Sequence, residues 1–371
     1  MRIAWDGRAL VAPRTGIGWY TYHLLRGFEQ VQADWTGHLL LNREIDDRFD
    51  PRIRRETIRF PNTVRLRPLY ERFLLPRKLN QLQPDVWHSP MTVIPEGLEN
   101  VRTVATVHDV AFRLFPDIQP PAYRNYWNYW TEQACRRADR IVAVSEATRR
   151  DLLEHFGADP LKVVVVHEAA DPFMAREIPE EDLVSVRTRY ALPDRFLFFV
   201  GTLEPRKNLS LLFEVYRIAR DRGVDLPVLI VAGGKGWLQD RIESEAAKAG
   251  DKVRFVGYLD RENLRAFYRL ADLVLVPSLY EGFGLQAVEA MAAGAVVLAS
   301  DVSSLPEVVG QGGLLLPPDD PEAWLSMIEE LLKNPEGRSG WRAKAKTQAA
   351  RFSWERTTRE TFDVYRAALT S

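Results

Sequence analysis

The chain has 371 residues, of which 46% are hydrophobic and 27% are charged, the composition of a folded protein rather than a disordered or fibrous one. Its length exceeds the size at which a single hydrophobic core usually stops growing, so we expect two domains. Fifty basic and 51 acidic residues leave a formal net charge of -1 at pH 7. This balance excludes the broad positive surface of a dedicated nucleic-acid-binding protein, and we expect no nucleic-acid partner.

Features that report on cellular location point to the cytoplasm. The single cysteine, Cys135, has no partner for a disulfide within the chain. The first ten residues, MRIAWDGRAL, lack the charged and then apolar order of a signal peptide. No apolar run approaches the roughly 18 residues that a membrane-spanning helix needs. We therefore expect a cytoplasmic protein whose membrane contact, if any, is peripheral.

The first half of the chain alternates short apolar runs with segments of helical periodicity. The apolar runs that predict strands are residues 2–5, 86–88, 101–107, 140–144 and 163–166. The predicted helices are residues 20–28, 123–138 and 146–156, the last with Ser145 as its N-cap. This alternation predicts parallel strands joined by helices, which we assign to an α/β domain over residues 1–170.

A loop with two glycines, Gly16 and Gly18, separates the first predicted strand from the first predicted helix. It lacks the third glycine of the dinucleotide-binding fingerprint. The loop is therefore either a simple turn or a place where the backbone approaches a phosphate or an acceptor.

Residues 64–82, VRLRPLYERFLLPRKLNQL, combine Leu, Phe and Tyr with Arg and Lys. Such a composition is compatible with a helix that lies on an anionic lipid surface. A core helix with a solvated basic face fits it better, so membrane contact remains the second interpretation. The tyrosines and tryptophans of residues 123–130 recur at helical spacing, which is more typical of core packing than of a platform for sugars.

His108 and Asp109 directly follow the apolar run TVATV. They are expected at the carboxyl end of a strand, where α/β proteins bind ligands. His108 could contact a donor sugar or an acceptor, with Asp109 fixing the orientation of its ring. Taken alone, the pair would be read as a capped turn, and only the other motifs favour a site.

A second α/β domain is predicted after a proline-rich and charged linker, residues 171–195. Its predicted strands are residues 196–200, 227–232, 253–256, 273–276 and 296–299. Its predicted helices are residues 209–221, 238–249, 262–270 and 284–293. This pattern is a doubly wound sheet over residues 196–352, whose ligand should bind beyond the carboxyl ends of the strands.

A loop suited to an anion follows the first strand of this second domain. In residues 200–209, VGTLEPRKNL, the strand reaches Gly201, and a helix begins after Arg206 and Lys207. Glycine permits close approach of the backbone, a helix start offers unpaired N–H groups, and the two side chains add positive charge. These features fit a diphosphate, although a surface Arg-Lys pair before an ordinary helix would look the same.

Two glutamates with seven residues between them follow the strand at residues 273–276. Glu281 lies in a glycine-rich turn, and Glu289 lies about two turns along the next helix. One carboxylate can therefore meet a sugar while the other accepts hydrogen bonds from a ribose. Backbone N–H groups at the helix N-terminus would stabilise a leaving phosphate, and they belong to Gly282, Phe283, Gly284 and Leu285.

With these motifs the chain resembles family four of the glycosyltransferases, the retaining group with the GT-B fold. Arg206 and Lys207 followed by the pair Glu281 and Glu289 carry the likeness most specifically. It spans nearly the whole length and includes the Gly16–Gly18 loop, VHDV, VSEATRRDL, VGYLDRENL and FSWE. The resemblance implies an α/β protein with two Rossmann-like doubly wound domains that face a cleft. The apolar last helix, residues 353–371, would cross back to the N-terminal domain.

The resemblance also implies roles for single residues of the donor site. Arg206 and Lys207, beside Gly201, would bind the donor diphosphate, Glu289 would bind the ribose, and Glu281 would contact the transferred sugar. Tyr258 would flank the base.

In the N-terminal domain, which would hold the acceptor, His108 would line the donor-sugar side. Gly16 and Gly18 would let the first loop approach the phosphate. The segment HEAADP, residues 167–172, departs from the Asn-Gly-Val-Asp turn that many relatives have at the junction of the two domains.

The reaction implied is transfer with retention of configuration, with no cofactor and no protein nucleophile. Because neither half shows an Asp-x-Asp motif, we expect no metal and assign its role to cationic side chains and helix N-termini. Residues 5–21 most resemble mannosyltransferases of surface-polysaccharide assembly, which favours GDP-mannose as donor and a saccharide or lipid-linked saccharide as acceptor. A UDP-hexose donor is the second choice.

A phosphorylase-like enzyme would need a pyridoxal phosphate lysine that we do not recognise. A nucleotide-sugar-binding module without catalysis is the remaining alternative.

Overall fold

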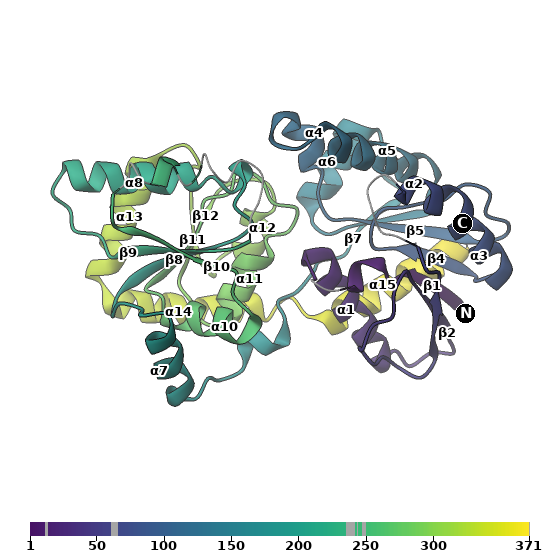
Figure 1. Ribbon diagram of the computed structural model, residues 1–371, viewed down its shortest axis with the longest axis horizontal. Helices are drawn as coiled ribbons and strands as arrows, with labels where there is room; N and C mark the ends of the chain where they lie inside the picture. The colour runs from purple at the N-terminus through teal and green to yellow at the C-terminus, as the bar shows by residue number, and fades with distance from the viewer. Residues whose placement is uncertain (12–13, 61–65, 235–241, 243, 247–249, 371) are drawn as a thin grey trace. The chain divides into compact units, whose positions relative to one another are not determined.

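The computed structural model describes residues 1–11, 14–60, 66–234, 242, 244–246 and 250–370 (Figure 1). The chain divides into two compact units, Met1–Glu168 with Ser353–Ser371, and Ala169–Phe352. Both units are α/β, and each is described by itself. Within the described residues, no helix combines the length and the apolar character needed to cross a membrane.

The first unit is built on a seven-stranded sheet in which every neighbouring pair is parallel. The strands are β1 (Arg2–Asp6), β2 (Thr36–Leu41), β3 (Ile53–Thr57), β4 (Val86–Ser89), β5 (Arg102–Val107), β6 (Arg140–Ala143) and β7 (Val163–Val165). Their order in the sheet is β3-β2-β1-β4-β5-β6-β7. The order reverses between β1 and β4, so a ligand crevice is expected beyond the carboxyl ends of these strands.

Strands β2 and β3, at one edge of this sheet, are not predicted by the sequence. Strand β3 (IRRET) is mostly exposed, and β2 (TGHLLL) begins with an exposed threonine and a glycine. Strand β2 nevertheless pairs with β1, and β3 pairs with β2. Strand β3 is the edge strand, and its polar sequence fits that position, whereas the three leucines of β2 are buried.

Helices cover both faces of the first sheet. The longer ones are α1 (Gly16–Gly27), α5 (Pro121–Arg137), α6 (Glu146–Phe156) and α15 (Trp354–Leu369). The short segments are η1 (Arg8–Leu10), η2 (Phe28–Gln30), α2 (Arg67–Leu69), the π-helical η3 (Tyr70–Leu74), α3 (Leu75–Leu82), α4 (Ala111–Leu114) and η4 (Pro116–Ile118). Helices α4, α5 and α6 lie on one side of the sheet, and α1 and α15 lie on the other (Figure 1). Ser145 is confirmed as the N-cap of α6, because its hydroxyl accepts a hydrogen bond from the Thr148 N–H at 3.0 Å.

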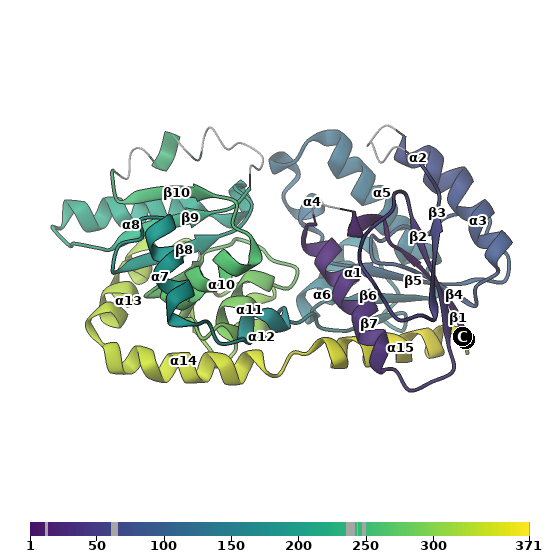
Figure 2. The same ribbon diagram turned by 60° about the horizontal axis from the view of Figure 1, so that its bottom comes forward.

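The last helix, α15, packs against α1 and the first sheet, which confirms the predicted return of the chain (Figure 2). Tyr365 of this helix is fully buried, and its hydroxyl oxygen accepts a hydrogen bond from Trp5 Nε1 at 2.9 Å. The same oxygen lies 2.6 Å from His88 Nδ1, and His88 Nε2 lies 2.8 Å from Thr106 Oγ1. Burial lowers the pKa of His88 to about 3, so this imidazole is neutral at physiological pH. Helix α15 is therefore part of the core of the first unit.

The second unit contains a six-stranded parallel sheet with the order β10-β9-β8-β11-β12-β13. Its strands are β8 (Phe196–Val200), β9 (Val228–Ala232), β10 (Val253–Gly257), β11 (Leu273–Val276), β12 (Val297–Ser300) and β13 (Leu314–Leu316). The first five confirm the predicted strands. The apolar runs of β8, β9, β11 and β12 are mostly buried, as expected for parallel strands covered on both faces, whereas the edge strand β10 is only partly buried. The order reverses between β8 and β11, and the crevice of this unit is expected there.

The helical segments of the second unit are η5 (Pro172–Ala175), α7 (Glu180–Arg189), η6 (Pro205–Lys207), α8 (Leu209–Asp221), α10 (Arg261–Leu270), α11 (Leu285–Ala292), α12 (Leu305–Val309), α13 (Pro321–Lys333) and α14 (Pro335–Ala349). Most of the helix predicted at residues 238–249 lies outside the described residues, but the described ones, 242 and 244–246, are helical. Residues 171–195, predicted as a linker, hold η5 and α7, which contact α11 and α10 and cluster with this unit.

Candidate functional site

The candidate site lies at the carboxyl ends of β8 and β11, the two strands at which the second sheet reverses its order. The loop after β8 carries Arg206 and Lys207, and the loop after β11 carries Glu281. Because parallel neighbours end at the same edge of a sheet, these two loops meet. The structure thereby brings together residues that are 74 and 75 positions apart in the sequence.

The loop after β8 is held in place by Asn208, which adopts a left-handed conformation with φ of 56° and ends the η6 turn. Its side-chain Nδ2 donates hydrogen bonds to the carbonyl oxygens of Pro277, at 3.0 Å, and Pro318, at 2.8 Å. The N–H of Leu279 donates to the Arg206 carbonyl at 2.9 Å. These bonds join the two loops independently of the charged side chains.

The backbone of a neighbouring loop comes closer to Gly233 than any other segment comes to Gly201. A Cβ atom on Gly233 would lie 1.8 Å from the Gly201 carbonyl oxygen, so the loops after β9 and β8 touch there. A Cβ on Gly201 would meet only ordinary contacts, the nearest at 3.5 Å from the Phe199 ring. The protein itself therefore requires glycine at position 233, a requirement that the sequence analysis missed.

The carboxylate of Glu281 is the centre of the site. Its Oε1 lies 2.6 Å from Lys207 Nζ and 2.6 Å from Ser278 Oγ, and it accepts a bond from Gln286 Nε2 at 2.5 Å. Its Oε2 accepts a hydrogen bond from Arg206 Nη1 at 3.1 Å. Glu281 is only 5% exposed and Lys207 is 7% exposed, so this ion pair is buried.

Arg206 connects this carboxylate to a second one. Its Nη2 donates to Glu204 Oε1 at 2.6 Å, and its Nη1 also donates to the Tyr280 carbonyl at 2.6 Å. Two cationic and two anionic side chains therefore share the cluster formed by Glu204, Arg206, Lys207 and Glu281, which we call the four-charge cluster. Its formal charges balance, so a ligand phosphate would have to share the two cations with the carboxylates.

The surroundings of Glu281 favour its ionised form. Burial alone would raise the pKa of this carboxyl, but the charges of Lys207 and Arg206 and the hydrogen bonds from Lys207 and Ser278 outweigh burial. Together they lower the pKa of Glu281 to about 2. The carboxylate is therefore charged throughout the physiological range.

The pH dependence of stability is expected to report this carboxylate. Because the pKa of Glu281 is about 2 in the folded protein against an ordinary 4.5, its ionised form stabilises the fold above about pH 4.5. That contribution is lost as the pH falls towards 2. The melting temperature of the protein should therefore exceed that of Glu281→Gln most at neutral pH, and the difference should narrow on acidification. Melting curves followed by circular dichroism measure this, and a difference that stays constant into acid would contradict it.

Helix α11 begins at the same turn. Its N-cap, Gly284, has φ of +98°, and a Cβ there would lie 2.9 Å from the Leu305 side chain, so glycine is required. Ser304 Oγ lies 2.9 Å from the carbonyl oxygens of Glu281 and Phe283 and fixes the turn. The buried Gly282 and the partly buried Leu285 complete the turn. The positive end of the α11 dipole therefore lies beside the four-charge cluster.

Two further residues predicted for the donor site lie on elements of the same sheet. Glu289 is partly buried on the second turn of α11. Burial raises the pKa of Tyr268 on α10, and the charge of Glu289 raises that pKa further, which places the carboxylate near α10. Tyr258 follows β10 directly and is 72% exposed. Tyr258 therefore lies at the carboxyl end of the sheet, and Glu289 lies on the helix that follows the carboxyl end of β11.

In the first unit, His108 follows β5 but is oriented by a residue other than the predicted one. Its Nδ1 lies 2.7 Å from Glu168 Oε1, and its Nε2 lies 3.0 Å from the Pro90 carbonyl. Asp109 instead accepts a hydrogen bond from the Ala111 N–H at 3.0 Å, at the start of α4. The prediction that Asp109 fixes the His108 ring is wrong, because its carboxylate bonds to the Ala111 N–H instead. Glu168, 60 residues away, has that role.

The predicted glycine loop of the first unit is also different in the structure. Gly16 and Gly18 form the first turn of α1, which begins four residues earlier than predicted. A Cβ on Gly18 would lie 2.4 Å from the Ala9 carbonyl oxygen. Packing of α1 against the η1 segment therefore explains this glycine without a ligand.

The sequence analysis missed several polar residues that hold the site. They are Glu168, Glu204, Ser278, Gln286 and Ser304. Glu204, Ser278 and Gln286 lie within five residues of the motif residue that they contact, so the sequence could have indicated them, whereas Glu168 and Ser304 make contacts across the fold. Within the described part of the chain, no three His, Cys, Asp or Glu side chains are grouped so that they could hold a metal ion.

Two protein families match this chain in consecutive stretches. The family described as Glycosyltransferase Family 4 matches residues 14–172, which contain His108 and Glu168. The family described as Glycosyl transferases group 1 matches residues 186–348, which contain the whole four-charge cluster.

Single proteins of known name match across both units. The O-antigen chain mannosyltransferase B of Escherichia coli is 28% identical over 99% of this chain and 100% of its own length. A D-inositol 3-phosphate glycosyltransferase of Kineococcus radiotolerans is 32% identical over 81% of this chain and 71% of its own. The solved structure of sucrose-phosphate synthase from Thermosynechococcus elongatus has a TM-score of 0.80 at 21% identity, covering 99% of this chain and 98% of that one. The likeness in structure confirms the predicted α/β fold class with two Rossmann-like domains.

Proposed function

This chain belongs to the group 1 glycosyltransferases, and on that premise we propose that it transfers a hexose from a nucleotide-diphosphate donor to a saccharide acceptor. The observation that carries the proposal is the four-charge cluster beside the N-terminus of α11. Two fixed cations and a helix N-terminus converge there, the combination that suits a diphosphate.

We assign the reaction to transfer with retention of configuration. The acceptor oxygen forms a bond to the anomeric carbon on the face from which the donor phosphate leaves. The bond between that carbon and the phosphate oxygen breaks, and the departing phosphate takes the acceptor proton. Negative charge builds on the diphosphate, so Arg206, Lys207 and the α11 N-terminus stabilise the transition state. By analogy with oxyanion-hole donors, each contributes about 2.7–4 kcal/mol. In this proposal these groups, rather than a divalent metal or a cofactor, offset the charge.

Glu281 has a limited capacity for the transferred sugar. Its Oε1 already has three partners, Lys207, Ser278 and Gln286, whereas one hydrogen bond to its Oε2, from Arg206, is seen. A sugar hydroxyl would therefore bond to Oε2, or it would displace one of the other donors. Either way, Glu281 holds the two cations in place before the donor binds.

The proposed donor is GDP-mannose, with a UDP-hexose as the alternative. The Escherichia coli relative is named a mannosyltransferase, which supports mannose as the transferred sugar. The Kineococcus radiotolerans relative is named for D-inositol 3-phosphate, so acceptors vary among similar chains. Thermal-shift measurements with GDP and UDP test the base, because a ligand at 100 times its dissociation constant adds about 2.7 kcal/mol of stability. A larger shift with UDP would replace GDP-mannose by a UDP-hexose.

A donor-hydrolysis assay separates the enzyme from a nucleotide-sugar-binding module. We expect slow release of mannose from GDP-mannose by water, with NMR showing the anomer of retained configuration as the first product. Stabilisation by nucleotide without any hydrolysis or transfer would favour the binding module. Inverted configuration in the first product would contradict the retaining reaction.

We further propose that the protein acts at the inner face of a membrane through helices α2, η3 and α3. The exposed large side chains of this segment are Leu66, Leu69, Phe73 and Leu74, with Leu69 at 50% and Phe73 at 59% exposure. Leu66, Leu69 and Phe73 recur at helical spacing and share one face. Arg72 and Arg77 are exposed beside them. An apolar face with basic neighbours fits an anionic lipid surface.

Replacing Phe73 by serine is expected to weaken binding to phosphatidylglycerol vesicles about tenfold, because an apolar ring no longer enters the lipid. Vesicle flotation measures the bound fraction. The matched control is Leu161→Ser, at an apolar residue of the first unit that is 84% exposed and lies outside this segment. Equal flotation of Phe73→Ser and the unaltered protein, or equal binding to uncharged vesicles, would contradict the proposal.

A further inference from the structure

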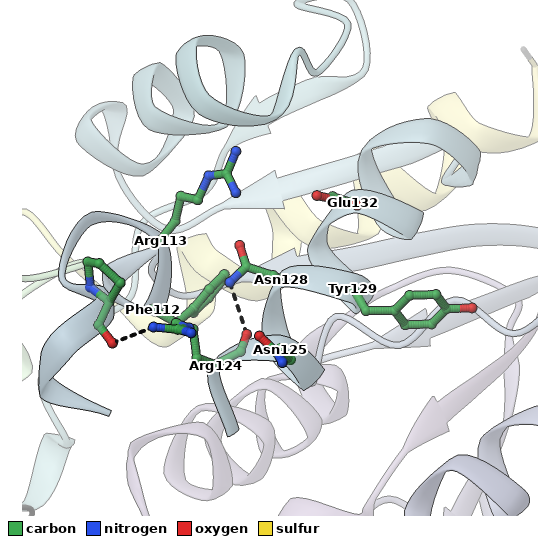
Figure 3. Close-up of a pocket in the computed structure, with 8 residues that line it drawn as sticks. Phe112, Arg113, Arg124, Asn125, Asn128, Tyr129 and Glu132 are labelled. Atoms are coloured by element: carbon green, nitrogen blue, oxygen red, sulfur yellow. Dashed lines mark hydrogen bonds between the residues drawn. The ribbon is translucent and has the colours of Figure 1, made fainter. Parts of the chain in front are cut away.

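A pocket of about 560 Å³ lies in the first unit, within the volume range of small-molecule sites (Figure 3). It is formed by α4, η4 and one face of α5. The residues that line it are Phe112, Arg113, Pro116, Arg124, Asn125, Asn128, Tyr129 and Glu132. None of the interactions described for the candidate site uses these side chains.

The position of this pocket follows from the strand that precedes it. Helix α4 starts at Ala111, three residues after His108 and the carboxyl end of β5. Ligands of α/β proteins bind beyond the carboxyl ends of strands. The pocket therefore lies at the ligand-binding edge of the first sheet, on the same connection as His108.

An amide in the wall of the pocket has an unused acceptor. Asn128 Nδ2 donates to the Arg124 carbonyl at 3.0 Å (Figure 3), but within the described residues its buried Oδ1 has no hydrogen-bond partner. A buried acceptor without a donor is costly, and such groups are rare in folded proteins. A ligand hydroxyl in the pocket would satisfy this oxygen once a neighbouring side chain of the lining moves aside.

The rest of the lining suits a neutral sugar better than a phosphate. Arg124 Nη1 already donates to the Pro116 carbonyl at 2.9 Å, and the guanidinium of Arg113 lies over the Phe156 ring. The carboxylate of Glu132 opposes an incoming anion. Asn125 and the phenol of Tyr129 add groups that both donate and accept. The Phe112 ring supplies an apolar surface for the C–H groups of a sugar ring. Alternating donors and acceptors over an apolar floor match the hydroxyl pattern of a hexose.

Helix α5 also connects the pocket to the exposed apolar segment. Tyr126 on this helix donates a hydrogen bond to Glu71 Oε1 at 2.5 Å, and Trp130 Nε1 donates to Glu71 Oε2 at 3.0 Å. Glu71 belongs to η3, which also carries Phe73. One face of α5 thus lines the pocket, and another holds the segment that we propose to meet lipid. An acceptor whose lipid stays in the membrane could place its sugars in the pocket.

We propose that this pocket binds a sugar residue of the acceptor saccharide other than the one that is glycosylated. The inference rests on the proposed function, because only a transferase has an acceptor. Binding of a neutral saccharide to the pocket can nevertheless be measured without catalysis. Asn125, Asn128, Tyr129 and Glu132 would then determine which saccharides are accepted.

The test uses mannobiose as the probe and saturation-transfer NMR on the full chain. The double variant Asn125→Ala/Tyr129→Ala removes two exposed lining groups on consecutive turns of α5, so the fold should be retained. We expect mannobiose to bind at least about tenfold more weakly to it. Arg136→Ala, an exposed residue of the same helix outside the pocket, is the control and should bind mannobiose normally.

A second variant separates recognition from stability. Asn128→Leu replaces the unsatisfied amide by an apolar group of similar size, so the melting temperature should be unchanged or higher, while mannobiose binding falls. Thermal shifts with GDP and UDP are recorded on the same variants. Unaltered mannobiose binding in both variants, or no binding to the unaltered protein, would overturn the pocket assignment. Absent nucleotide shifts together with pocket-dependent mannobiose binding would instead overturn the proposed function alone.

Discussion

Replacing Lys207 by alanine is expected to lower kcat by about 100-fold to 1,000-fold, the loss seen when one preorganised donor to a developing negative charge is removed. Lys207 Nζ is buried and fixed at 2.6 Å from Glu281, so no water-exposed side chain can replace it easily. Release of GDP from GDP-mannose measures kcat. Circular dichroism checks the folded fraction of each variant. Lys252→Ala, at an exposed lysine of the same unit, should stay within a factor of a few.

A loss of stability could imitate this loss of turnover, because Lys207→Ala leaves a buried carboxylate with fewer partners. The double variant Lys207→Ala/Glu281→Gln removes that charge as well, so its melting temperature should recover part of the loss. Turnover should not recover with it. Normal turnover of folded Lys207→Ala, or recovery of activity together with stability in the double variant, would assign Lys207 a structural role only.

Replacing Glu289 by glutamine is expected to raise the KM for the donor by about 10-fold to 100-fold, the size of a lost hydrogen bond to a charged group. The ribose does not change during the reaction, so kcat should remain close to that of the unaltered protein. Initial-rate measurements over a range of donor concentrations separate the two constants.

The control for Glu289 is Glu330→Gln, an exposed glutamate of α13. A second check uses the 2'-deoxy form of the donor nucleotide, which should bind Glu289→Gln and the unaltered protein with similar affinity. A fall in kcat with an unchanged KM would show that Glu289 acts on the reacting sugar instead of the ribose.

The sequence predicts most of the buried strands of both sheets correctly, because parallel strands covered on both faces are short apolar runs. It misses β3, whose residues are polar because it is an edge strand, and β2, whose apolar run is limited to three leucines after a glycine and a histidine. It also misses β13, which has three residues. The early start of α1 was also missed, since glycine lowers helix propensity and the close approach of the Ala9 carbonyl to Gly18 is a tertiary contact.

The predicted residues of the candidate site are motif residues, but the ion pairs that join them to one another and to Glu168 are not local. The pairing of Arg206 and Lys207 with Glu281 links two loops 74 and 75 residues apart, and that of His108 with Glu168 spans 60. Neither separation leaves a periodic signal in a single sequence. The neighbouring Asp109 is the nearest carboxylate along the chain, and local spacing alone cannot show that it bonds to the Ala111 N–H instead.

The place of α15 in the first unit bears on the order in which the protein matures on the ribosome. The pocket around Trp5 and His88 is filled by Tyr365, which is synthesised 360 residues after Trp5. Until Tyr365 is synthesised, the indole N–H and the imidazole lack the hydroxyl that they share. The sheet formed from the first residues therefore lacks part of its core. The second unit, contiguous between Ala169 and Phe352, has all of its own strands before that moment. Because synthesis runs from the N-terminus to the C-terminus, we therefore expect the second unit to complete its fold before the first unit does.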